Sequence, residues 1–262
     1  MTQLLVAAAL LLGAAAPGFA DVTLKMTTSN TGGGVANKAP GTVYIKGNRM
    51  RTDLQIGTRV QTTIFDVDAQ KMFVFDSTKK EADVWDMRAL SADLSTSVDA
   101  SAMSASITPN GQTREVGGHT AAGYQLAISV SAAPDGKTPL QVNATLAGPV
   151  WIVTGAPGAA DYVGFYRAAA EKGFIFNDPR AARAQPGAAR AMAEMYRRMA
   201  EIGGIPYASE VQIKLEGSGP LAAALAQIGN LSMTTVVESV ATDAVPDALF
   251  SPPAGYVTNA RN

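Results

Sequence analysis

Chemically reactive side chains are few in this chain, and none falls into a catalytic motif. The 262 residues include no cysteine and a single histidine, His119, in the run Gly117-Gly118-His119-Thr120. A histidine can act as a general base near neutral pH, but no serine, aspartate or glutamate stands in a recognisable motif with it. We therefore expect His119 to lie in a surface loop between strands. One histidine without cysteine also does not make a typical zinc site.

Three other segments resemble functional motifs, and each lacks a required residue. The Gly-Ser-Gly run at 217–219 lacks the outer glycine of a nucleophile turn, and the proline after it favours a helix start. Asp66 and Asp68 share one turn, without the other acids and the glycine of a calcium loop. Lys38 lies in a Gly-rich stretch, 30–40, whose spacing does not fit a phosphate loop and predicts a flexible loop. The sequence thus predicts no catalytic residue, no metal site and no cofactor.

The remaining functional signal is apolar. Met192, Met195, Tyr196 and Met199 recur at helical spacing and predict one face of a helix. Methionine side chains are flexible and polarisable, so they suit surfaces that accept varied apolar ligands, and they also fill gaps in cores. This face therefore either lines an apolar cleft or completes a core.

The element that such a helix would cover is a sheet. From Arg49 to Ile56, polar residues alternate with Met50, Thr52 and Leu54, which predicts a strand with one buried face. This strand belongs to a meander of five strands joined by short turns between residues 41 and 86.

One strand of this meander is apolar on both of its faces. In the segment Lys71–Phe75, Met72 and Val74 point one way, and Phe73 and Phe75 point the other. A strand of this kind needs cover on both sides.

Strands of similar character recur before and after a block of helical pattern at 159–203. We therefore predict an α+β fold in one domain over residues 21–262. A curved antiparallel sheet of roughly ten or more strands, too wide to stay flat, forms a half-open barrel. Helices from 159–203 cover its concave face as a lid, with smaller helices at 87–94 and 220–228. Residues 95–106 are weakly patterned and predict a frayed helix or loop.

The first twenty residues have the character of a secretory signal peptide. An apolar run, Leu4–Leu12, is followed by Gly18-Phe19-Ala20, which predicts cleavage between Ala20 and Asp21. A membrane anchor is disfavoured because the run is too short to span a bilayer comfortably. We expect the protein in a bacterial periplasm or the medium, without the cysteine that an acylated lipoprotein carries after its cleavage site.

Charge narrows the range of partners. The chain has 21 basic and 22 acidic residues, whereas a protein whose main partner is nucleic acid has a strongly basic surface. No apolar segment after residue 20 is long enough to cross a membrane. We therefore expect neither nucleic acid nor a stable membrane span.

Four short segments carry a family resemblance, namely the strand and turn at 41–51, the hairpin at 66–76, the Gly-to-Tyr strand start at 117–124 and the ending at 250–256. Together they resemble the LolA/LolB-like periplasmic lipoprotein carriers. The chain is most similar to an exported branch that is described as a domain of unknown function. The resemblance implies a half-open antiparallel barrel with a helical lid over an apolar cavity, and the better-known members carry acyl chains of lipoproteins. The chain departs from the carrier at Lys46, which is followed by Gly47-Asn48 instead of an Arg-Pro turn.

These observations lead to a hypothesis of a non-enzymatic protein that holds a lipid or acyl chain between sheet and helices. The expected lining consists of the apolar residues of the predicted strands and helix, namely Met50, Leu54, Ile64, Met72, Met192, Met195, Tyr196 and Met199. The alternative is a structural or protein-interaction module of the cell envelope with a filled core. A hydrolase is disfavoured because no catalytic set is found.

Overall fold

The computed structural model describes residues 20–32, 35–97, 103–132, 142–176, 178–218, 222–223, 225, 227 and 231–261. The predicted signal peptide, 1–20, lies outside these residues except for Ala20. The predicted helix at 220–228 also lies mostly outside them.

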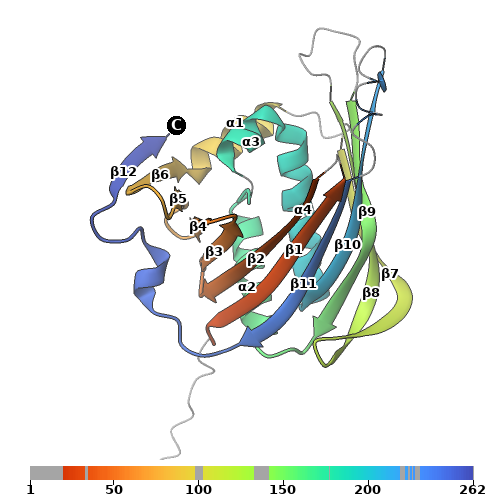
Figure 1. Ribbon diagram of the computed structural model, residues 1–262, viewed down its shortest axis with the longest axis horizontal. Coiled ribbons are helices and arrows are strands. Elements are labelled where there is room, and N and C mark those ends of the chain that lie inside the picture. Colours follow the sequence, from red (N-terminus) through yellow and green to blue (C-terminus); the bar gives the residue numbers. More distant parts are fainter. Residues whose placement is uncertain are drawn as a thin grey trace, which may run out of the picture.

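A single curved sheet of twelve strands dominates the described part of the chain (Figure 1). Its spatial order is β12-β6-β5-β4-β3-β2-β1-β11-β10-β9-β8-β7, and every pairing is antiparallel except that of β12 with β6. The strands are β1 (Val22–Gly32), β2 (Val35–Lys46), β3 (Arg49–Ile56), β4 (Arg59–Asp66), β5 (Lys71–Asp76), β6 (Glu81–Asp86), β7 (Met103–Val116), β8 (His119–Ala132), β9 (Val142–Thr154), β10 (Gly204–Gly217), β11 (Leu231–Ala241) and β12 (Val257–Arg261). The prediction of a large curved sheet in an α+β fold is confirmed.

Helices lie inside the curve of this sheet (Figure 1). They are α1 (Met87–Ser97), α2 (Ala159–Glu171), α3 (Pro179–Ala184) and α4 (Pro186–Ile202). Asp178 caps α3 by accepting a hydrogen bond from the backbone N–H of Arg180 at 2.8 Å. Gln185 is not helical and Pro186 starts the next helix, because proline suits the first turn and not the interior. The predicted helical cover at 159–203 is thus present in three pieces.

Strand structure replaces part of two segments for which no strand was predicted. The Gly-rich stretch at 30–40 extends β1 and β2, which stay paired out to Gly32 and Val35. The hydroxyl groups of Thr31 and Ser232 hydrogen-bond at 2.5 Å, so β11 supports this extension from the other side. At 95–106, α1 continues to Ser97 and β7 begins at Met103. The flexible loop predicted at 30–40 was therefore wrong. At 95–106 the predicted helix is present as far as Ser97, and the prediction was wrong from Met103 onward, where the chain forms a strand that pairs with β8.

The apolar residues of β3, β4 and β5 divide between the two faces of the sheet. Met50 pairs with Phe65 and Phe65 with Met72, so these three side chains share the concave face and pack under the helices. Ile64 pairs with Arg51 and Phe73, which places it on the convex face. The expectation that Ile64 lies with Met50 was therefore wrong by one residue in a pattern of period two.

A C-terminal segment covers the convex face here. It includes a short 3-10 helix, Asp247–Phe250, and its residues Val245 and Phe250 are buried against Ile64 and Phe75. The requirement for cover on both faces of β5 is confirmed, with helices on one side and this segment on the other.

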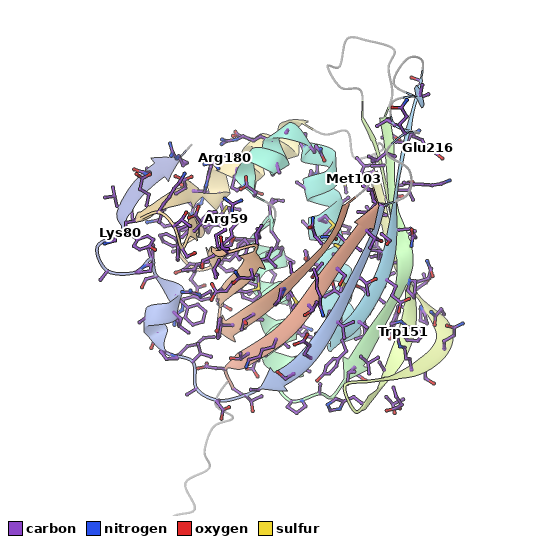
Figure 2. All side chains as sticks on the ribbon, in the orientation of Figure 1. Arg59, Lys80, Met103, Trp151, Arg180 and Glu216 are labelled. Carbon is purple, nitrogen blue, oxygen red and sulfur yellow. The ribbon has the colours of Figure 1, made fainter. Side chains whose placement is uncertain are left out.

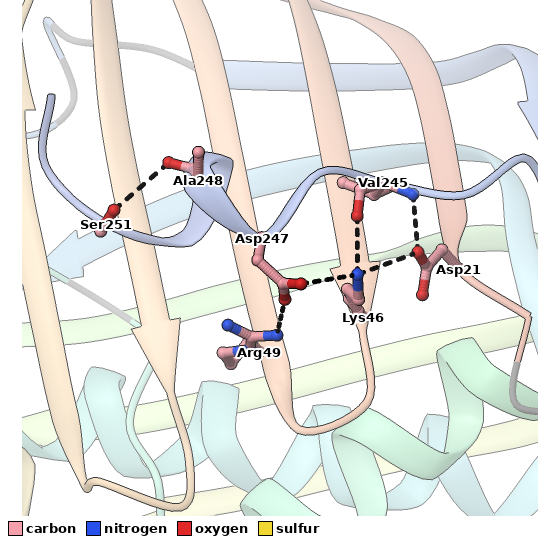
Figure 3. A network of polar contacts seen from close by, with 7 residues as sticks. All are labelled: Asp21, Lys46, Arg49, Val245, Asp247, Ala248 and Ser251. Atoms are coloured by element: carbon pink, nitrogen blue, oxygen red, sulfur yellow. Dashed lines mark hydrogen bonds and ion pairs between the residues drawn. The ribbon is translucent and has the colours of Figure 1, made fainter.

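Polar contacts fix the C-terminal segment in place (Figure 3). The Lys46 ammonium donates to the Val245 carbonyl at 2.8 Å, and the Arg49 guanidinium donates to Asp247 at 2.6 Å. The Val245 N–H donates to the Asp21 carboxylate at 2.6 Å. Hydrogen bonds from Arg49 and Lys46 lower the pKa of Asp247 below its ordinary value. Lys46, the last residue of β2, thus helps to hold the segment on the outside of the sheet.

Candidate functional site

An apolar cavity of about 300 Å³ lies between the concave face of the sheet and helices α2 and α4. Its sheet wall comes from six strands, β1, β2 and β8 to β11. Among the side chains of that wall are Leu24, Met26, Val43, Val211, Met233 and Val237. No charged residue is among its described lining residues, and the polar side chains there are hydroxyl groups from threonine, serine and tyrosine.

Helix α4 supplies the opposite wall through its methionines. Met192, Met195 and Met199 stand three and four residues apart, so they lie on one face of the helix and meet the cavity together. Met195 and Met199 are buried. The structure therefore brings together the four helical residues of the predicted lining, Tyr196 included.

The four predicted strand residues lie elsewhere. Met50 and Met72 are buried in the core beneath the helices, and the Tyr166 hydroxyl donates to the Met50 sulfur at 3.6 Å. Leu54 is partly buried opposite Gly41 in β2, and Ile64 is on the convex face.

An aromatic cluster fills the concave side of β3 to β5 in place of a cavity. Phe65 contacts Phe174 and Phe176 edge-on, with ring centroids 6.0 and 5.4 Å apart. The residues between α2 and α3 thus occupy the space that the sequence suggested for a ligand.

The missed lining residues come from the middle of the sheet. Leu24 and Met26 alternate along β1, and Val211 and Met233 face each other across β10 and β11. In β1, the alternation of apolar and polar residues indicates that Leu24 and Met26 share a buried face. Nothing local in the sequence indicates that β1 lies beside β11, about two hundred residues away.

Three tyrosines stand where α2 meets α4. The rings of Tyr166 and Tyr196 stack with centroids 5.0 Å apart and planes inclined by 12°. Tyr162 lies against Tyr166 at 4.8 Å. Burial raises the pKa of all three phenols above its ordinary value. These hydroxyl groups therefore stay neutral at physiological pH.

A second pocket, of about 270 Å³, lies on the other side of the tyrosine pair, between α1, α2 and α4. It is lined by Phe174 and Phe176 and also by Arg190, Glu194 and Arg197. Arg197 donates two hydrogen bonds to Glu194, both at 2.7 Å. The bond from Arg197 is the main cause of the lowered pKa of Glu194, and Arg198 contributes further.

A third pocket, of about 290 Å³, is polar and lies at the β5–β6–β12 end of the sheet. Arg59 and Arg180, labelled in Figure 2, belong to its lining. Asp83 there pairs with Arg180 and, at 2.8 Å, with Arg261. These charges serve to join α3 and β12 to β6.

The described part of the chain offers few groups for metal binding or acid–base chemistry. No group of three or more His, Asp or Glu residues there is placed to hold a metal ion. His119 is the first residue of β8, after a glycine turn, and its ring lies 5.2 Å from that of Tyr207. None of the described helices is long and apolar enough to cross a membrane.

Comparison with known proteins gives only distant similarities. No family model and no curated protein matches the chain. The solved structure of PNGF-II is similar over 92% of this chain with 10% identity and a TM-score of 0.37, and the chain spans 31% of that protein's length. A LolA superfamily protein from Nitrosomonas europaea is similar over 89% of this chain and 90% of its own, with 7% identity and a TM-score of 0.30. Neither similarity is close enough to transfer a ligand or an activity to this chain.

Proposed function

We propose that the protein is an exported, non-enzymatic binding protein that holds a lipid or acyl chain between its curved sheet and α4. The observation that carries this proposal is the cavity of about 300 Å³ without a charged lining residue. Small-molecule sites are mostly apolar and occupy about 300–1000 Å³, so this cavity falls at the lower end of their range. Its methionine wall adapts to chains of different shape.

Burial of apolar surface supplies the driving force. A ligand chain gains about 25 cal/mol for each Å² of apolar surface that it removes from water. An apolar cavity offers water few hydrogen-bond partners and lowers stability when it is empty. The described walls therefore favour an apolar occupant over solvent.

Export and family membership are parts of the same proposal. Export rests on the apolar run and small-residue cleavage site at the start of the chain. Membership of the LolA/LolB-like superfamily rests on the four sequence segments together with the half-open sheet and helical cover. Amino-terminal sequencing of protein recovered from its host tests export, with Asp21 as the expected first residue.

Ligand binding is tested on protein purified from its host. Native mass spectrometry followed by lipid extraction should recover a bound lipid, and the stripped protein should then bind a fluorescent fatty acid. A Met192→Trp variant places a larger side chain at the cavity wall and should weaken this binding. Glu201→Trp is the matched control, because Glu201 is exposed on the same helix and does not line the cavity.

Two outcomes would contradict the proposal. Recovery of no lipid, together with no binding of the fluorescent fatty acid, would favour a structural module of the cell envelope. Equal loss of binding in Met192→Trp and Glu201→Trp would show that the probe does not bind in the cavity.

A further inference from the structure

The apolar cavity and the pocket with the arginines share one wall. Tyr166 and Tyr196 line both of them. Their rings stack face to face, so two adjoining chambers of about 300 and 270 Å³ are separated at this place by one pair of aromatic side chains. A ligand that occupies both chambers would pass beside this pair.

The sequence of α4 makes the wall of one chamber charged and the wall of the other apolar. Arg190, Glu194 and Arg197 are spaced by four and three residues and form one stripe, which faces the second pocket. The methionines at 192, 195 and 199 form a second stripe on the opposite side of the helix, which faces the cavity. Tyr196 lies between the stripes and contributes to both walls.

The charged stripe has an excess of positive charge. The second pocket has two arginines and one glutamate in its lining. Glu194 is also paired with Arg198 at 2.7 Å, so its charge is compensated from two sides. Arg197 uses three of its five N–H donors on Glu194 and Glu201. Arg190, Arg197 and Arg198 together exceed Glu194 and Glu201 by one positive charge, so an anion at this stripe would meet a net positive charge and the remaining N–H donors of Arg197.

We infer that the ligand is a single-chain amphiphile with an anionic head group, with its chain in the cavity and its carboxylate or phosphate beside Arg190 and Arg197. This inference rests on the proposed function. The small cavity volume favours one chain over the two of a phospholipid. The neutral phenols of Tyr166 and Tyr196 lie where the apolar chain of such a ligand meets its polar head, and an aromatic ring with one polar edge suits that boundary.

Calorimetric titration of stripped protein with three probes tests the inference. Laurate carries the chain and the charge, lauryl alcohol carries the chain alone, and inorganic phosphate carries charge alone. Laurate should bind about tenfold more tightly than lauryl alcohol, as expected for one charge-assisted hydrogen bond. Phosphate alone should show no measurable binding.

Two variants then locate the head group. Arg197→Gln should remove most of the advantage of laurate and leave the affinity for lauryl alcohol unchanged. Arg198→Gln is the matched control, because Arg198 pairs with the same glutamate but does not line the second pocket. It should change the affinity for laurate by less than about twofold, the size expected for an exposed charge. If Arg197→Gln does not fold, Arg190→Gln provides the same comparison.

The outcomes separate the two proposals. Equal affinity for laurate and lauryl alcohol overturns the anionic head group and leaves the apolar binding function intact. Equal loss of laurate affinity in Arg197→Gln and Arg198→Gln overturns the assignment to the second pocket. Binding of phosphate as tight as that of laurate shows an anion site without a chain. Binding of no probe overturns the inference together with the proposed function.

Discussion

Replacement of Phe250 by alanine should destabilise the protein without weakening ligand binding. Phe250 is 5% exposed and packs in the convex-face cluster with Ile64 and Phe75. Phe→Ala changes in cores cost about 3–5 kcal/mol. The guanidinium of Arg49 lies 4.9 Å from the ring centre and adds about 0.5–1 kcal/mol. Because Phe250 lies in a C-terminal segment that can relax, we expect the lower end, about 3 kcal/mol in all.

Urea unfolding followed by circular dichroism measures this loss. The midpoint should fall while the slope of the free energy of unfolding against urea stays constant, as expected when only stability changes. Leu249→Ala is the matched control. Leu249 is only partly buried in the same segment, and its backbone carbonyl still accepts the bond from Arg51, so about 1 kcal/mol is expected.

Two results would refute this reasoning. A loss below about 1 kcal/mol for Phe250→Ala would mean that the C-terminal segment does not cover the convex face in solution. Loss of fatty acid binding under conditions in which Phe250→Ala is fully folded would mean that the two faces of the sheet do not act independently.

Three further predictions follow from single positions. Gly148→Ala should lower the free energy of unfolding by about 2 kcal/mol or more, as measured by thermal unfolding, because an added Cβ would lie 2.0 Å from a carbonyl oxygen of β10. Unchanged stability would contradict that geometry. Burial raises the pKa of Tyr162 and Tyr166, so their phenols ionise in the unfolded chain first, and the contribution of these two groups to stability should be constant below about pH 10 and fall above it. Phenolate absorbance that rises well before unfolding would argue against buried rings. Asp21→Ala removes the acceptor of the Val245 N–H and should lower the free energy of unfolding by about 1–2 kcal/mol, with Asp21→Asn losing less.

Features encoded within a few residues were predictable from the sequence. Alternation along β3 assigned Met50 to the buried concave face and Arg51 to the other face. Asp178 and Pro186 are local signals of the same kind at the starts of α3 and α4, because capping and proline act on the nearest turn. The methionine face of α4 was found for the same reason.

Features that depend on distant partners were not predictable in this way. The extension of β1 and β2 through the Gly-rich stretch depends on a neighbouring strand that begins at Leu231. The sheet wall of the cavity depends on the same neighbours, since Thr28 stands opposite Thr235 across β1 and β11. Ile64 lies on the convex face for a related reason, because a shift of one residue along a strand moves a side chain to the other face of the sheet.

The position of the cavity follows from how the helices are held over the sheet. On the β3 to β5 side, phenylalanines from the segment after α2 reach the strands and fill the space. Further along, the stacked Tyr166 and Tyr196 occupy the contact between α2 and α4, and unbranched methionines extend from α4 toward β1, β10 and β11. The tyrosine rings lie between the two helices, and the methionine side chains of α4 do not fill the space beneath. Close packing over the middle of the sheet would require branched or aromatic residues on α4, so a cavity remains there. The same tyrosines that separate the two chambers therefore also account for the space in which we propose that the ligand lies.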